Sequence, residues 1–129
     1  MATSANEGRI TGLDHVQLTM PAGAEHEATC RAFYIGALGL EEVEKPDVLK
    51  PRGGLWFQGA GFQLHLSIEE PMVTRRHPGL VTDDLDAIRA RIEAAGYATV
   101  DDPGIPGVIR FYVIDPFQNR LEIQQHLRA

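Results

Sequence analysis

Cysteine is almost absent from this 129-residue chain, which contains Cys30 alone. A single cysteine excludes both an intrachain disulfide framework and a zinc site built from several thiolates. Long hydrophobic runs are missing too, since no apolar stretch approaches the roughly 18 residues that span a bilayer. The segment from Met1 to Arg9 contains no apolar core of the kind found in a secretory signal. We therefore expect a cytoplasmic protein that does not cross a membrane.

Basic clusters are scarce as well. Twelve Lys and Arg stand against eighteen Asp and Glu, which gives a formal net charge of -6. Such a chain is a poor candidate for binding nucleic acid or an anionic membrane. Hydrophobic residues make up 43% and charged residues 23%, as in ordinary globular domains. We expect one domain over residues 11–126, preceded by a flexible N-terminus at 1–10.

The first half of the chain shows the pattern of a strand, a helix and three more strands. Residues 13–20 alternate between apolar and polar side chains, as a half-buried strand does. An apolar stripe at helical spacing follows, made of Cys30, Phe33, Tyr34 and Ala37. Three strands are expected after this helix, at residues 40–43, 55–58 and 62–68.

The second half repeats this order. A strand at 77–82 is followed by a helix with the stripe Leu85, Ile88, Ile92 and Ala95, and then by strands at 97–100, 109–114 and 120–124. Gly39 and Gly96 both suit a helix end and lie 57 residues apart, as do Leu64 and Leu121. The sequence therefore predicts a duplicated unit, with module one at about 12–70 and module two at about 75–126.

Overlaying the two halves places metal-capable side chains on equivalent positions. His15 coincides with His77, and His65 coincides with Glu122. A carboxylate inside an apolar strand is costly unless it is paired or coordinates a cation. Imidazole and carboxylate ligands together suit divalent Fe, Mn, Co, Ni or Zn. If the two units pair about a pseudo-twofold axis, all four side chains converge on a metal site.

Several segments of the chain resemble one known family. The most specific is the ending Asp115-Pro116-x-x-Asn119-x-x-Glu122, and the others are Leu13-Asp14-His15-Val16, Ala32-Phe33-Tyr34 through Leu40, and His77 through Gly96. Over residues 12–125 the chain resembles the vicinal oxygen chelate superfamily, which contains glyoxalases, bleomycin-resistance proteins and extradiol dioxygenases. The resemblance implies an α+β fold in which two paired βαβββ modules form a cupped mixed β-sheet with the helices outside.

The resemblance also implies roles for the four metal-capable residues. The family's dioxygenases and fosfomycin-resistance transferases use two His and one Glu, which His15, His77 and Glu122 can supply. Glyoxalase I members usually have Glu at the position of His65, close to the proton-transfer step. We therefore expect His65 and Glu122 to be catalytic, with His65 as a possible fourth ligand.

Further residues are candidates for binding the substrate. If Phe57 and Phe111 face the core, their neighbours Trp56 and Tyr112 face the cup. Gln63 flanks His65 on the same strand face. Arg110 and Arg120 have guanidinium groups that could bind a substrate carboxylate.

Two functions remain open at this point. The first is a metal-dependent enzyme acting on a small oxygen-rich metabolite, by lyase, isomerase or dioxygenase chemistry through a metal-stabilised oxyanion. The second is a metal-free protein that binds or sequesters a small molecule, of the bleomycin-resistance type. The resemblance and the prevalence of twofold symmetry favour a homodimer, and the cup could form within one chain or by exchange of modules between two.

Overall fold

Two βαβββ modules build the chain, as predicted. The computed structural model describes residues 8–127. In the first module, the sheet has the strand order β1-β4-β3-β2, with β1 parallel to β4 and the other pairs antiparallel. Its elements are β1 (His15–Met20), α1 (Ala24–Arg31), the π-helical turn η1 (Ala32–Ala37), β2 (Glu41–Val43), the 3-10 helix η2 (Asp47–Arg52), β3 (Leu55–Gly59) and β4 (Phe62–Ile68).

The second module has the same topology. Its sheet has the order β5-β8-β7-β6, again with one parallel pair, β5 with β8. Its elements are β5 (Gly79–Val81), α2 (Leu85–Ala94), β6 (Thr99–Asp101), β7 (Val108–Ile114) and β8 (Arg120–His126). The identical strand order confirms the internal repeat that the residue offsets predict.

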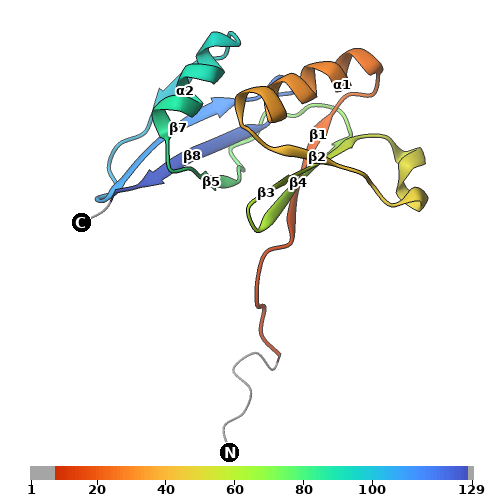
Figure 1. The fold of residues 1–129 in the computed structure, drawn as a ribbon, viewed down its shortest axis with the longest axis horizontal. Coiled ribbons are helices and arrows are strands. Elements are labelled where there is room, and N and C mark those ends of the chain that lie inside the picture. The colour runs from red at the N-terminus through yellow and green to blue at the C-terminus, as the bar shows by residue number, and fades with distance from the viewer. Residues whose placement is uncertain (1–7, 128–129) are drawn as a thin grey trace, which may run out of the picture.

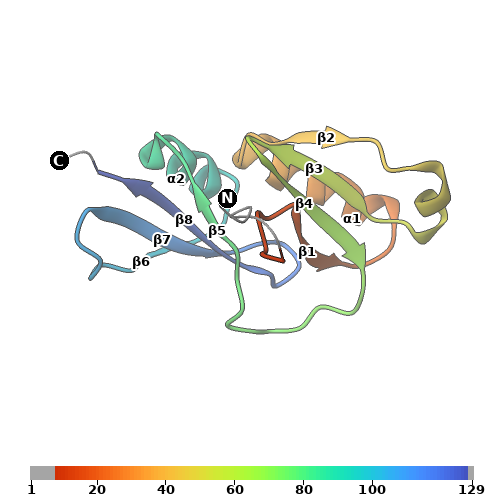
Figure 2. The same ribbon diagram turned by 90° about the horizontal axis from the view of Figure 1, so that it is seen from below.

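The two helices lie side by side on one side of both sheets (Figure 1). Seen from below, the two sheets sit next to each other, and the connection 69–78 loops between β4 and β5 (Figure 2). The other face of each sheet is therefore not covered by α1 or α2. β1 and β5 each lie at the end of their sheet, so each has one unpaired edge within the chain.

The structure differs from the sequence prediction mainly in the connections. The strand predicted at 77–82 is shorter and begins at Gly79, so His77 precedes it. The predicted first helix continues as the π-helical turn η1, whereas the 3-10 helix η2 was not predicted. Residues 1–7 of the expected flexible N-terminus lie outside the described residues. Among residues 8–127 no helix combines the length and the apolar character needed to cross a membrane.

The predicted helix stripes do pack into the core. Cys30, Phe33, Tyr34 and Ala37 are buried, and so are Leu85, Ile88 and Ile92, whereas Ala95 is exposed. Phe57 and Phe111 are fully buried on the helix-facing sides of their sheets. Burial raises the pKa of the Cys30 thiol to about 12, which fits its role as a small core residue.

A buried polar cluster connects the modules. Tyr34 in η1 donates its hydroxyl to Asp115 Oδ2 at 2.5 Å, and Asn119 Nδ2 donates to the same oxygen at 2.8 Å. Asn119 also donates to Thr19 O at 2.7 Å and accepts from Thr19 N–H at 3.2 Å. Asp115 Oδ1 accepts the backbone N–H groups of Phe117 and Asn119, both at 2.8 Å. Strand β1 and η1 are thereby fixed to the β7–β8 turn.

Removing the Tyr34 hydroxyl is expected to weaken this connection. Tyr34→Phe leaves the buried Asp115 carboxylate one donor short, so the free energy of unfolding should fall by about 1–3 kcal/mol. Denaturant unfolding measures the change. Tyr97→Phe is the matched control, because Tyr97 packs its ring against Phe33 and its hydroxyl has no hydrogen-bond partner among the described residues. Equal stability of Tyr34→Phe and Tyr97→Phe would contradict this account.

A close backbone approach fixes the end of the β2–β3 connection. Gly54 has φ +83°, and a Cβ there would clash with the carbonyl oxygen of Leu66 in β4. Gly61 has a similar φ of +79° but open space around it. We expect Gly61→Ala to cost about 1 kcal/mol from backbone strain, and Gly54→Ala to cost about 1–3 kcal/mol more. If both variants lose the same free energy of unfolding, a steric contribution from the contact between residue 54 and Leu66 is excluded.

Candidate functional site

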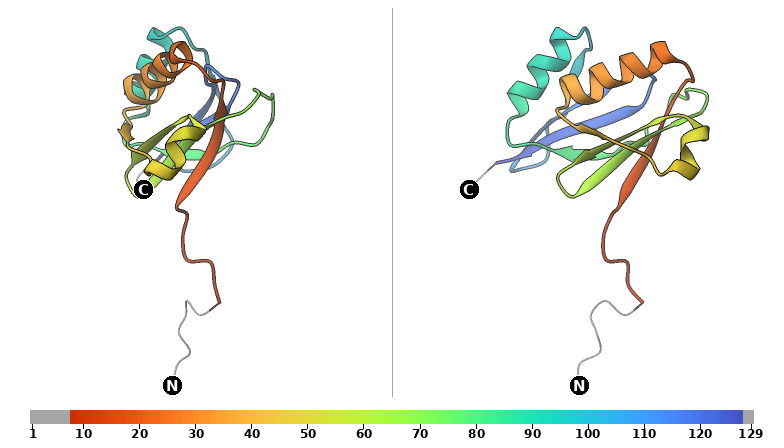
Figure 3. Two further views of the ribbon diagram at one scale, coloured as in Figure 1. Left: turned by 90° about the vertical axis from the view of Figure 1, so that its right-hand side faces the viewer. Right: turned by 45° about the vertical axis from the view of Figure 1, so that its right-hand side comes forward.

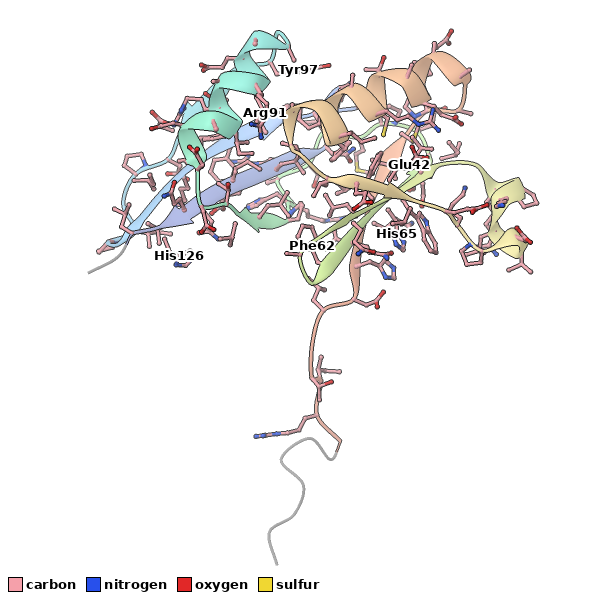
Figure 4. The ribbon with its side chains drawn as sticks, in the orientation of Figure 1. Glu42, Phe62, His65, Arg91, Tyr97 and His126 are labelled. Atoms are coloured by element: carbon pink, nitrogen blue, oxygen red, sulfur yellow. The ribbon has the colours of Figure 1, made fainter. Side chains whose placement is uncertain are left out.

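His15 and His65 project from neighbouring strands of the first sheet. β1 and β4 pair in parallel register, with Gln17 opposite His65 and His15 opposite Gln63. Leu64 and Leu66 face the core, so the alternation of the strand turns His65 to the other face (Figure 4). The predicted polar face of β4 therefore coincides with the open side of the sheet.

Three rings stack in series on this face. The Trp56 ring lies 3.8 Å from the His65 ring at an interplanar angle of 4°, and His65 lies 4.1 Å from His15 at 14°. His65 Nε2 is 2.8 Å from Gln63 Oε1, while Gln63 Nε2 donates to Gln58. This chain of amides makes Nε2 the protonated nitrogen of neutral His65. Burial, and then the nearby His15, lower the pKa of His65.

The stacking bears on which histidines can share a metal ion. The lone pair of an imidazole nitrogen lies in the plane of its ring, and the His15 and His65 planes are almost parallel. Lone pairs in parallel planes do not meet at one point, so the two rings as arranged cannot ligate the same ion. The His65 ring therefore lies flat beside the His15 ring and does not share a ligand position with it.

His77 and Glu122 meet in the second module. The Glu122 backbone N–H donates to Pro78 O at 3.1 Å, which brings the preceding residue, His77, against the carboxylate. His77 Nε2 lies 3.2 Å from Glu122 Oε1. His77 Nδ1 is 2.8 Å from the carbonyl oxygen of Arg75, which can only accept, so Nδ1 carries the proton. In this tautomer Nε2 and the carboxylate are two acceptors facing each other, an arrangement that a cation between them would stabilise.

Arg110 and Tyr112 surround the same carboxylate. Arg110 Nη1 lies 3.3 Å from Glu122 Oε1, and its Nη2 lies 3.2 Å from Asp102 Oδ2. Partial desolvation and a hydrogen bond to Glu122 raise the pKa of Tyr112. Arg110 is therefore engaged by two carboxylates, and Glu122 is charge-compensated although it is buried.

Arg120 behaves differently from Arg110. Its guanidinium lies over the Tyr112 ring, with the central carbon 4.2 Å from the ring centroid. Its Nε is buried and has no hydrogen-bond partner in the described part of the chain. Arg120 and His77 line a cavity of about 390 Å³ between β1 and the connection 69–78.

The four metal-capable residues do not form one cluster within the chain. His15 contacts His65, and His77 contacts Glu122. Within residues 8–127, no three His, Cys, Asp or Glu side chains lie together in a way that could hold a metal ion. The convergence that a pseudo-twofold pairing would produce is thus not found among residues 8–127 of one copy, where His15 lies apart from His77 and Glu122.

Sequence reasoning did not anticipate two further features of the site. Asp14 Oδ1 is 2.8 Å from His15 Nδ1, so this carboxylate fixes the proton on Nδ1 and leaves Nε2 free. Its adjacency to His15 is the signal that could have revealed it. Lys45 and Arg52 lie in a connection without periodicity, and they border the cavity next to His15 and His65.

A sequence profile of the Glyoxalase/Bleomycin resistance protein/Dioxygenase superfamily matches residues 12–123. The chain belongs to this superfamily. Among solved structures, a glyoxalase family protein from Bacillus anthracis is 39% identical, with a TM-score of 0.82 over 91% of this chain and 96% of that one. No curated protein is significantly similar to the chain in sequence.

More distant superfamily members share the fold. Lactoylglutathione lyase from Agrobacterium tumefaciens is 22% identical with a TM-score of 0.68, over 90% of this chain and 94% of that one. The fosfomycin resistance protein FosX from Listeria monocytogenes, in complex with Mn(II) and 1S,2S-dihydroxypropylphosphonic acid, is 19% identical with a TM-score of 0.70. That match covers 93% of this chain and 92% of that one.

The ring stack predicts a pH-dependent signal. Trp56 is the sole tryptophan of the chain, and protonated imidazole quenches indole fluorescence. We expect the emission to fall on acidification with a midpoint below 6.5, because burial lowers the pKa of His65. Since the folded pKa lies below the unfolded one, the corresponding stability is present above pH 6.5 and is lost as the pH falls through the folded pKa.

The control for this titration is His65→Gln, which keeps a planar polar side chain beside Trp56 but cannot titrate. The transition should disappear in this variant and persist in His126→Gln, which changes an exposed histidine at the end of β8. A midpoint above 6.5, or a transition that survives in His65→Gln, would contradict the assignment.

Proposed function

We propose that this protein is a metal-dependent enzyme acting on a small oxygen-rich metabolite, with its site assembled from half-sites of two copies of the chain. The observation that carries the proposal is the state of His15 and His77. Each donates Nδ1–H to a neighbouring acceptor, which leaves Nε2 as the nitrogen with a lone pair. Histidines that bind metals usually donate their other ring N–H to a carboxylate or a carbonyl in this way.

His15, His77 and Glu122 are the proposed ligands. Two imidazoles and a carboxylate suit divalent Fe, Mn, Co, Ni or Zn. A bound metal with open positions would polarise a substrate oxygen and stabilise negative charge on it. The Mn(II) in the structure of FosX, and the activity in the name of the lactoylglutathione lyase, support a metal and a lyase, isomerase or dioxygenase reaction.

The remaining predicted residues receive distinct roles in this proposal. Arg110 is a positioning residue, since it is held by Asp102 and directs Glu122. Arg120 and Tyr112 contact the substrate, and Arg120 lines the cavity beside His77. Trp56, Gln63 and His65 form a wall, on which His65 presents its unprotonated Nδ1 to the substrate.

A homodimer would complete the site. Each chain supplies His15 on one sheet and the pair of His77 and Glu122 at the other, and these do not combine within a chain. The outer edges of β1 and β5 are unpaired, and the nearby apolar side chains of Leu13 and Val81 are exposed. A second copy that covers these edges would bring one copy's His15 to the other copy's Glu122.

Metal content tests the ligand set. The protein, purified without a metal-affinity tag or chelator, is offered Fe, Mn, Co, Ni and Zn separately and analysed by mass spectrometry. We expect about one metal per chain in the wild type, and loss of at least about tenfold in affinity for Glu122→Gln and for His15→Ala. The control His126→Gln should retain its metal. Full metal occupancy in Glu122→Gln would exclude Glu122 as a ligand.

Mixing two defective variants tests the sharing of the site. His15→Ala and Glu122→Ala should each bind little metal alone. In a mixed dimer one of the two sites receives both intact halves, so random exchange should restore about a quarter of the wild-type metal. A site contained in a single chain gives no recovery, because every copy then carries one lesion.

One observation favours a second function, that of a metal-free protein that binds a small molecule. Within one chain, Glu122 already contacts His77 and Arg110, so its burial does not depend on a metal. Absence of metal binding under all of the conditions above would favour this function, and calorimetric screening of small organic acids and drugs would then replace assays of turnover.

A further inference from the structure

A second cavity lies beside His15 and His65, and its walls carry positive charge. Its volume is about 340 Å³, and it extends from the ring stack to η2. Figure 3 shows η2, in yellow, at the outer end of the first sheet. Two cations line the cavity: Lys45, which precedes η2, and Arg52, which is its last residue. The other lining residues include Trp56 and the polar side chains of Gln17, Gln63 and Ser67.

The charge of this cavity opposes that of the chain. The whole chain has a formal net charge of -6, yet the lining contains two cations and one carboxylate, Asp14. Asp14 is already bonded to His15 Nδ1. Arg52 has neither a hydrogen bond nor an ion pair among the described residues. The free positive charge of the lining is therefore available to a ligand.

Backbone contacts hold Lys45 and the residues that follow Arg52 in place. Lys45 Nζ donates to the carbonyl oxygen of Gly53, which leaves two of its three N–H donors for other partners. Gly54 then meets β4 at a distance that no side chain would permit. The connection is thus anchored at the residues that follow Arg52.

Lys50, a third cation of the same connection, has different partners from Lys45 and Arg52. Lys50 Nζ lies 2.5 Å from Glu44 and 2.9 Å from Asp47, and it does not line the cavity. Two neighbouring carboxylates neutralise Lys50, whereas Lys45 and Arg52 face the cavity without one.

We propose that this cavity binds the anionic group of the substrate, a carboxylate or a phosphonate or phosphate. Arg52 would pair with it through two N–H donors, Lys45 would supply a point charge, and Trp56 would cover one face of the molecule. The substrate of the proposed enzyme is then an organic acid whose remaining oxygens lie towards His15. The inference rests on the proposed function for the identity of the ligand as a substrate, while the anion site itself needs no metal.

Anion binding can be measured directly, because Trp56 lies in the cavity wall and is the sole tryptophan. The full-length protein, once treated with chelator and once loaded with metal, is titrated with malonate, methylphosphonate and inorganic phosphate. Fluorescence and calorimetry report binding. We expect saturable binding in both forms that weakens with added salt. A preference for malonate or for the phosphorus oxyanions would assign the group that the substrate carries.

Variants test whether the two cations are responsible. Arg52→Gln should raise the dissociation constant at least about tenfold, as the loss of a charge-assisted pair does. Lys50→Gln is the matched control and should change it by less than about twofold. Arg52 is exposed, so its variant should unfold like the wild type. Lys45→Gln should weaken binding as well.

Two results would overturn the inference. One is a wild-type protein that binds none of the three anions by calorimetry in either form. The other is an Arg52→Gln and a Lys45→Gln variant that both bind as tightly as Lys50→Gln. Metal stoichiometry, measured on the same samples, separates failure of this inference from failure of the proposed metal site.

Discussion

The buried carboxylate of Asp115 is the constraint on which the arrangement of the two modules depends. It accepts hydrogen bonds from Tyr34, from Asn119 and from two backbone N–H groups. Burial raises the pKa of Asp115, and these hydrogen bonds oppose that rise. Through Asn119 the cluster reaches Thr19 in β1, so the strand that begins at His15 and the turn that leads to Glu122 are set by one network.

The strands and helices could be predicted from hydrophobic periodicity, because each of these elements buries one face against the core. Alternation in β4 places Leu64 in the core and His65 on the opposite face of the sheet, and the helix stripes through Phe33 and Ile88 are buried as predicted. The connections follow other rules. The position of η2 depends on the approach of Gly54 to Leu66, a contact between residues distant in sequence, and periodicity carries no information about it.

The candidate site was predictable in its residue types but less so in its arrangement. The repeat offsets identified His15, His65, His77 and Glu122, and their roles remain predictions. The stacking of His65 between Trp56 and His15, and the engagement of Arg110 but not Arg120 by carboxylates, depend on three-dimensional packing. The separation of His15 from His77 and Glu122 follows from how the modules pack together.

The position of His77 in the connection 69–78, outside both sheets, has an evolutionary consequence. A strand residue cannot move without shifting its whole register, whereas a residue before β5 can be displaced by one insertion or deletion in the connection. Changes of loop length could therefore retune the environment of Glu122 while the sheets and the core stay intact. Within this fold, the connection is the segment in which new substrate preferences could arise at the lowest cost to stability.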